Sequence, residues 1–172
     1  MNSLSQSTQR NKTRRLVYMA ILLALSFVGA QVNVMGSIAL DSLPAFFAGL
    51  LFWPTSGAIV GGVGHLLTAM TSGFPMTVPI HILLMLTMAF VCWLYGYLNN
   101  RINITLNSII AILLNGVVAT YLSVMLMEYL GIIPNGKELF FILLGPLMLA
   151  STFNVVVAAI LYKLLKDKII KE

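Results

Sequence analysis

The sequence predicts an all-α integral membrane protein with six transmembrane helices and both termini in the cytoplasm. Hydrophobic residues make up 59% of the 172 positions, charged residues only 9%, and the mean hydropathy is +0.96. Soluble domains are usually about one-quarter charged, so a water-soluble globule is excluded. A disordered chain needs low hydrophobicity and high charge, the opposite of this composition. We expect one transmembrane domain over 1–172, with a basic cytoplasmic leader at 1–15 and a basic cytoplasmic tail at 166–172.

Long apolar stretches separated by turn-forming residues mark the helices. A helix that crosses the bilayer core needs about 20 mostly apolar residues. The candidates are Leu16–Gln31, Leu43–Met70, Pro79–Leu98, Asn107–Leu130 and Leu139–Leu165. Pro54 and Gly57 interrupt the second stretch, which predicts two shorter helices. The small residues at 28–30 also allow a cleaved signal peptide, although the apolar run continues past them.

The positions of the basic residues favour six crossings over five. Lys and Arg accumulate on the cytoplasmic side of membrane proteins. Five crossings would divide the ten basic residues evenly between the two sides. Six crossings leave only Lys137 outside and place the other nine inside: Arg10, Lys12, Arg14, Arg15, Arg101, Lys163, Lys166, Lys168 and Lys171. This distribution also explains the net charge of +5 without a nucleic-acid partner, because basic residues at helix ends meet anionic lipid headgroups.

Polar residues inside the apolar stretches point to a binding pocket near the outer face. Such groups are costly in a membrane and usually face the bundle interior or a cavity. In this chain they concentrate toward the predicted outer ends of the helices. The candidate substrate-binding residues are Asn33, Asp41, His65, Thr68, Thr71, Phe74, His81, Tyr121, Glu128 and Asn154.

Several of these residues also have a structural interpretation. Asp41 lies just before a proline-initiated helix and could cap it. His65 lies among glycines, where close helix packing could give it a backbone hydrogen-bond partner. Glu128 could simply reach the headgroup region. Asn115 and Asn154 lie near mid-membrane, where hydrogen bonds between helices are the more common use of asparagine.

Motifs for catalysis are scarce. Cys92 is the single cysteine, so it forms no internal disulfide, and one cysteine argues against a Cys-based metal site. The sequence has no Gly-x-Ser-x-Gly, no His-Glu-x-x-His and no functional nucleotide-binding loop. We therefore expect no enzymatic activity, no cofactor and no metal, so uphill transport would need a partner or an ion gradient. A stand-alone ion-coupled carrier or channel is the alternative, followed by a membrane-embedded enzyme.

Small residues mark a possible docking face on the first helix. Ala20 and Ala24 are one turn apart, and Leu16 and Val28 extend the same stripe. Small residues at this spacing let another helix approach closely, because association in lipid depends on packing. Internal packing and docking of a partner are both compatible with the pattern.

With these features the chain resembles the substrate-binding S components of energy-coupling factor (ECF) vitamin transporters. The resemblance covers nearly the whole chain and is most specific over Ile38–Gly49, Gly61–Thr68 and Thr71–Pro75. It implies the S-component fold, a prokaryotic plasma-membrane location and an outward-facing pocket for a vitamin or its precursor. It also implies that Ala20 and Ala24 dock on a transmembrane coupling subunit, which carries two cytoplasmic ATPases.

The resemblance extends to a substrate class. The Asp-Ser-x-Pro, Gly-His-Leu-Leu-Thr and Thr-Ser-Gly-Phe-Pro segments look most like members assigned to α-ribazole and related cobalamin precursors. Members for hydroxymethylpyrimidine, pyridoxine and pantothenate share much of this pattern and stay as alternatives. Asp41, His65 and His81 could hydrogen-bond sugar hydroxyls or ring nitrogens, and Phe74 could cover an aromatic ring.

Overall fold

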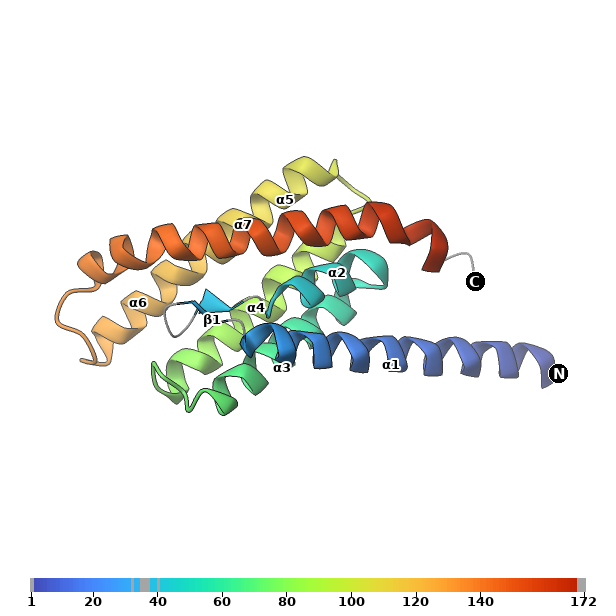
Figure 1. Cartoon of the computed structure of the whole chain (residues 1–172), viewed down its shortest axis with the longest axis horizontal. Coiled ribbons are helices and arrows are strands. Elements are labelled where there is room, and N and C mark those ends of the chain that lie inside the picture. Colours follow the sequence, from blue (N-terminus) through green and yellow to red (C-terminus); the bar gives the residue numbers. More distant parts are fainter. Residues whose placement is uncertain (1, 32, 35–37, 40, 170–172) are drawn as a thin grey trace.

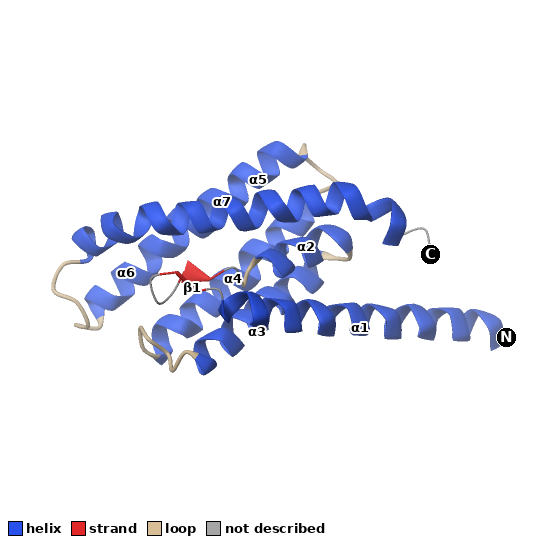
Figure 2. Cartoon of the chain, in the orientation of Figure 1, coloured by secondary structure: helices blue, strands red, loops and turns tan. Residues whose placement is uncertain are grey.

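Helices running roughly along one axis make up most of the molecule (Figures 1 and 2). The computed structural model describes residues 2–31, 33–34, 38–39 and 41–169. In chain order the helices are α1 (Asn2–Gln31), α2 (Leu43–Leu51), α3 (Pro54–Thr71), α4 (Val78–Leu98), α5 (Ile104–Leu113), the π-helical turn η1 (Leu114–Val118), α6 (Ala119–Tyr129) and α7 (Gly136–Ile169). Two short antiparallel strands, β1 (Asn33–Val34) and β2 (Ile38–Ala39), lie between α1 and α2.

The helix boundaries agree with the sequence in most places. The predicted break at Pro54 is confirmed, since α2 ends at Leu51 and α3 begins at Pro54. Proline suits the first helical position because its missing N–H would have no helical partner there. The N-terminal boundary differs from the prediction: α1 begins at Asn2, so most of the basic leader continues the first apolar helix.

Among the described residues, four helices are long and apolar enough to cross a membrane. They are Lys12–Gln31, Val78–Leu98, Ile104–Tyr129 and Gly136–Ile169. With nine residues, α2 is roughly 14 Å long and too short to span alone a hydrocarbon core of about 30 Å. The helical, multi-pass membrane architecture is therefore supported, whereas six crossings and the side of the termini stay predictions.

The two ends of the described chain lie at the same end of the bundle (Figure 1). Arg14 of α1 donates a hydrogen bond to the carbonyl oxygen of Ile169 at 3.1 Å. Arg15 donates to the hydroxyls of Thr55 and Ser56 at the start of α3, at 3.0 and 2.8 Å. The α3–α4 and α6–α7 loops lie at the opposite end (Figure 1). An even number of crossings requires both chain ends to lie on the same side of the membrane, as this arrangement would place them. Residues 170–172 of the predicted tail lie outside the described residues.

The core centres on α2, which contacts α1, α3, α4 and α7. Every residue from Pro44 to Leu51 is buried. The backbones of α2, α3 and α4 meet at Gly49, Gly57 and Gly96, which we call the glycine contact. A Cβ atom on Gly96 would lie 2.5 Å from the carbonyl oxygen of Gly49, and one on Gly57 would lie 2.8 Å from the Cα of Gly49. Any larger residue would push these helices apart.

Candidate functional site

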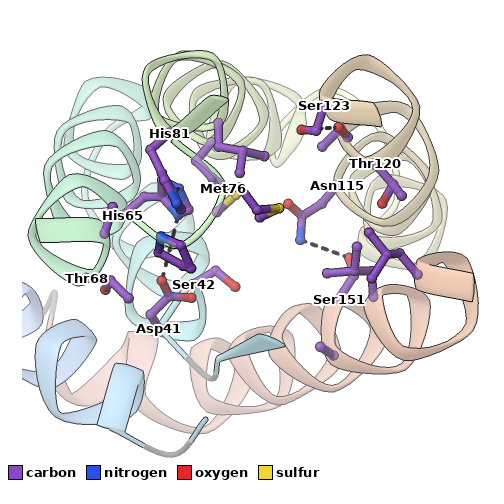
Figure 3. A pocket seen from close by; sticks show the side chains of 18 of the residues that line it. Asp41, Ser42, His65, Thr68, Met76, His81, Asn115, Thr120, Ser123 and Ser151 are labelled. Atoms are coloured by element: carbon purple, nitrogen blue, oxygen red, sulfur yellow. Dashed lines mark hydrogen bonds and ion pairs between the residues drawn. The ribbon is translucent and has the colours of Figure 1, made fainter. Parts of the chain in front are cut away.

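A cavity of about 140 Å³ lies between α3 and α4 on one side and η1, α6 and α7 on the other (Figure 3). Polar side chains line both sides: Asp41, Ser42, His65, Thr68, Ser72, His81, Asn115, Thr120, Ser123, Ser151 and Asn154. Apolar side chains fill the lining between them, with Met76, Met88, Met127, Leu143 and Leu147 among the largest. A mainly apolar pocket with several polar groups suits a small organic ligand.

Asp41 reaches the cavity because α1 holds its backbone. The Ser26 hydroxyl of α1 donates a hydrogen bond to the Asp41 carbonyl oxygen. Gly64 of α3 leaves space for this hydroxyl, because a Cβ atom there would lie 2.6 Å from the Ser26 oxygen. The capping interpretation of Asp41 is wrong: Ser42 occupies the N-cap position of α2. The Asp41 side chain is only 13% exposed, and this burial raises the pKa of its carboxyl, against hydrogen bonds with Thr68 and with backbone groups of Asp41 and Ser42.

The two histidines of the chain face each other across α3 and α4. Nδ1 of His81 lies 3.3 Å from Nε2 of His65, and their ring centroids are 5.5 Å apart. Nδ1 of His65 lies 3.9 Å from the Oδ2 atom of Asp41. His65 therefore lies between Asp41 and His81, as Figure 3 shows, and its ring nitrogens face these side chains rather than a backbone carbonyl. The structure brings together in one cavity three residues that are far apart in sequence.

The loop between α3 and α4 borders the cavity in an uncommon backbone conformation. Phe74 and Thr77 have φ angles of 51° and 78°, a region that residues with a side chain rarely adopt. Such strain often accompanies binding sites, where the surrounding structure holds it in place. Ser72, Pro75 and Met76 of this segment line the cavity. The Phe74 ring packs edge-on against His81 with centroids 5.7 Å apart, and Phe74 is not itself a lining residue.

The opposite wall depends on the π-helical turn. Asn115 lies within η1, and its Nδ2 atom donates to the Ser151 hydroxyl of α7 at 3.1 Å. This is the hydrogen bond between helices that the sequence predicted for Asn115. Thr120 and Ser123 donate their hydroxyl hydrogens to carbonyls of their own helix, so their oxygens can still accept from a ligand.

Sequence reasoning missed six polar lining residues. These are Ser42, Ser72, Asn115, Thr120, Ser123 and Ser151. A signal existed in their spacing, because Ser151 and Asn154 are three residues apart and share a helix face. Asn115 and Thr120 are five residues apart, which fits one face only if a π-helical turn intervenes.

The predicted site residues fall into two groups. Asp41, His65, Thr68, His81 and Asn154 line the cavity. Thr71, Tyr121 and Glu128 do not, and all three are exposed. The Thr71 hydroxyl donates to carbonyl oxygens of its own helix, and the Tyr121 ring packs against Phe140. Asn33 belongs to β1, and its side chain lies outside the described part of the chain.

The predicted docking stripe lies on an open face of α1. Ala20 and Ala24 are exposed, and Leu16 and Val28 beside them are 66% and 60% exposed. The other side of α1 packs on α2 and α3. No described residue of the chain therefore buries the stripe.

Comparison with known proteins assigns the chain to a family. A family model described as "ECF transporter, substrate-specific component" matches residues 14–166. No curated protein and no solved structure matches the chain. The matched residues include all those that line the cavity and the alanines of the α1 stripe. The chain therefore belongs to the substrate-specific components of ECF transporters, a family of substrate-binding membrane subunits and not of enzymes.

Proposed function

We propose that this chain captures a vitamin or vitamin precursor from outside a prokaryotic cell and delivers it through a coupling module. That module consists of a transmembrane coupling subunit and two cytoplasmic ATPases, which supply the energy. The observation that supports this proposal is the cavity itself, bordered by the α3–α4 loop at the end of the bundle opposite the basic chain ends. The positive-inside tendency of Lys and Arg would place that end outside.

The lining favours a neutral substrate that combines a flat ring with hydroxyl groups. Met76, Met88 and Met127 offer thioethers, which contact aromatic rings favourably. Asp41 and the histidines offer hydrogen bonds on one wall. The described lining contains an aspartate but no Lys or Arg to pair with an anionic substrate. This charge pattern disfavours the carboxylate of pantothenate.

α-Ribazole fits this description best, because it joins an aromatic benzimidazole to a ribose. Hydroxymethylpyrimidine and pyridoxine are the next candidates, since each has a single smaller aromatic ring with hydroxyl groups but no ribose. A thermal-shift series with the purified chain tests the choice. A ligand that binds the folded state stabilises it by RT ln(1 + [L]/Kd). We expect α-ribazole to raise Tm more than the other three compounds at equal concentration. A shift with pantothenate alone would contradict the assignment.

Uptake by proteoliposomes tests the mode of transport. We expect labelled α-ribazole to accumulate only when the coupling subunit, both ATPases and ATP accompany the chain. Accumulation driven by an ion gradient in vesicles that contain the chain alone would favour the ion-coupled carrier instead. Vesicles with the full module but a non-hydrolysable ATP analogue serve as the control.

A further inference from the structure

We propose that Asp41, His65 and His81 form a directional row that makes Nε2 of His81 a hydrogen-bond acceptor, so that the substrate must present an O–H or N–H donor to it. This inference rests on the proposed function, because it assigns a polarity to the same cavity. It goes further by specifying the protonation of each ring nitrogen and the part of the substrate that faces α4.

The contact between the two rings restricts their protonation. His81 Nδ1 and His65 Nε2 are 3.3 Å apart, so one nitrogen carries the hydrogen and the other accepts it. Two doubly protonated rings would place two N–H groups face to face. The separation of 3.3 Å is within hydrogen-bond distance, so the two rings pair directly.

Asp41 sets the direction of the row. An ionised carboxylate only accepts hydrogen bonds, and its Oδ2 lies 3.9 Å from Nδ1 of His65. The favoured tautomer of His65 then carries its hydrogen on Nδ1, and its Nε2 is unprotonated. Nε2 of His65 accepts a hydrogen bond from the Nδ1–H group of His81, so Nε2 of His81 is unprotonated as well. Burial raises the pKa of the Asp41 carboxyl and so opposes its charge, whereas hydrogen bonds with the Thr68 side chain and with backbone groups of Asp41 and Ser42 favour the ionised form.

Nε2 of His81 is the open end of this row. His81 is only 3% exposed, and its Nε2 atom is buried without a hydrogen-bond partner among the residues that the structure describes. A buried acceptor without a donor is unfavourable, so a ligand that supplies a donor relieves this penalty. Contact with the ligand requires a neighbouring side chain to move aside. Met76, a flexible lining residue, and Phe74, which packs on His81, belong to the adjoining loop.

The polarity of the row orients α-ribazole. Its unsubstituted benzimidazole nitrogen is an acceptor, and its only hydrogen-bond donors are hydroxyls of the ribose. The ribose therefore faces His81, and the ring system lies toward the methionines and leucines of the lining. The opposite orientation would place two acceptors against each other.

Nitrogen NMR of the substrate-free chain tests the inference directly. The full chain, purified without a histidine tag and labelled with ¹⁵N-histidine, gives signals from only two rings. His65→Gln or His81→Gln, whichever folds, assigns them. We expect both rings to be neutral, with a protonated Nδ1 and an unprotonated Nε2, although a free imidazole side chain prefers the Nε2–H form. A protonated Nε2 on His81 would overturn the proposal.

Two carboxyl variants test the role of Asp41. The amide of Asp41→Asn can donate as well as accept, so we expect both rings to return toward the Nε2–H tautomer. Glu138→Gln removes an exposed carboxylate that accepts from Asn135 and should leave both rings unchanged. Unchanged tautomers in Asp41→Asn would also overturn the inference.

Addition of α-ribazole separates this inference from the proposed function. Donation by a ribose hydroxyl should shift the Nε2 signal of His81 and leave its Nδ1 protonated. If the free chain shows the expected tautomers and α-ribazole leaves the spectrum unchanged, the polarity of the row stands and the choice of substrate is wrong. If α-ribazole binds while His81 carries its hydrogen on Nε2, the substrate stands and the inference is wrong.

Discussion

The two ends of the α3–α4 pair differ in packing: one end is in close backbone contact with α2, and the other borders the cavity. At the end near the chain termini, Gly57 of α3 and Gly96 of α4 bring both backbones against Gly49 of α2. Toward the other end, the same two helices carry His65 and His81, whose rings contact each other and line the cavity. His65 lies eight residues beyond Gly57, or roughly 12 Å along the helix. Close backbone contact at one end thus fixes the helices that hold a spacious, polar site at the other.

The two regions differ in what they tolerate. The glycine contact depends on backbone atoms that cannot move away, so replacing any of its glycines by a larger residue should destabilise the fold. The cavity depends on side chains with room around them, so a substitution there should reduce affinity and leave the fold intact. In lipid we expect this difference between the two regions to be large, because helix association relies on close packing without a hydrophobic driving force.

The largest expected effect is at the glycine contact. Gly96→Ala would place a Cβ atom 2.5 Å from the Gly49 carbonyl oxygen. We expect a loss of about 3 kcal/mol in the free energy of unfolding, at the upper end of the usual range for overpacking. Tm and the monodisperse fraction in detergent measure it. Gly145→Ala is the matched control, because nothing lies within 4 Å of its added Cβ atom. Equal Tm values for the two variants would contradict the rigid contact.

The second effect should be a loss of transport without a loss of substrate binding, because the altered residues lie outside both the cavity and the glycine contact. Ala20→Trp and Ala24→Trp place bulk on the exposed stripe of α1, away from the cavity and the glycine contact. Uptake by the full module should fall to background while the affinity for substrate stays nearly constant. Leu86→Trp on α4, which is 58% exposed, is the control for bulk on a lipid-facing surface and should transport normally. Equal losses of binding and uptake in the alanine variants would argue against a docking role.

The third effect tests the cavity wall. Asp41→Ala and His65→Ala should each weaken substrate binding by roughly 1–3 kcal/mol, because each removes a buried hydrogen-bonding group. Isothermal titration measures the change in Kd, and Tm without ligand should fall far less than in Gly96→Ala. Tyr121→Phe removes a hydroxyl outside the cavity and should bind normally. Unchanged affinity in both cavity variants would return Asp41 and His65 to a structural role.

Depth in the membrane could be predicted from the sequence better than rotation around a helix axis. Expected depth groups Asp41, His65 and His81, and the structure places them in one row. The same criterion selects Tyr121 and Glu128, yet neither lines the cavity. Both follow η1, and one inserted residue rotates the rest of a helix by about 100°.

The remaining differences have local causes that composition does not reveal. The nine-residue α2 begins beside the core, so Asp41 is largely buried and does not lie on an open outer surface. The positive φ angles of Phe74 and Thr77 depend on the helices that the loop joins and not on these residue types. Proline positions were more informative, since Pro54 marked the start of α3 correctly.

The smallest effect is expected within the second side of the cavity, where η1 contacts α7. Asn115→Ala removes the hydrogen bond to Ser151 but leaves the glycine contact and the histidine row untouched. Hydrogen bonds between membrane helices average about 0.6 kcal/mol, so Tm should fall only slightly. Thr87→Val on α4 is the control, because its hydroxyl bonds only its own helix, to the Leu83 carbonyl. A fall in Tm as large as that of Gly96→Ala would show that η1, and not the glycine contact, holds the cavity open.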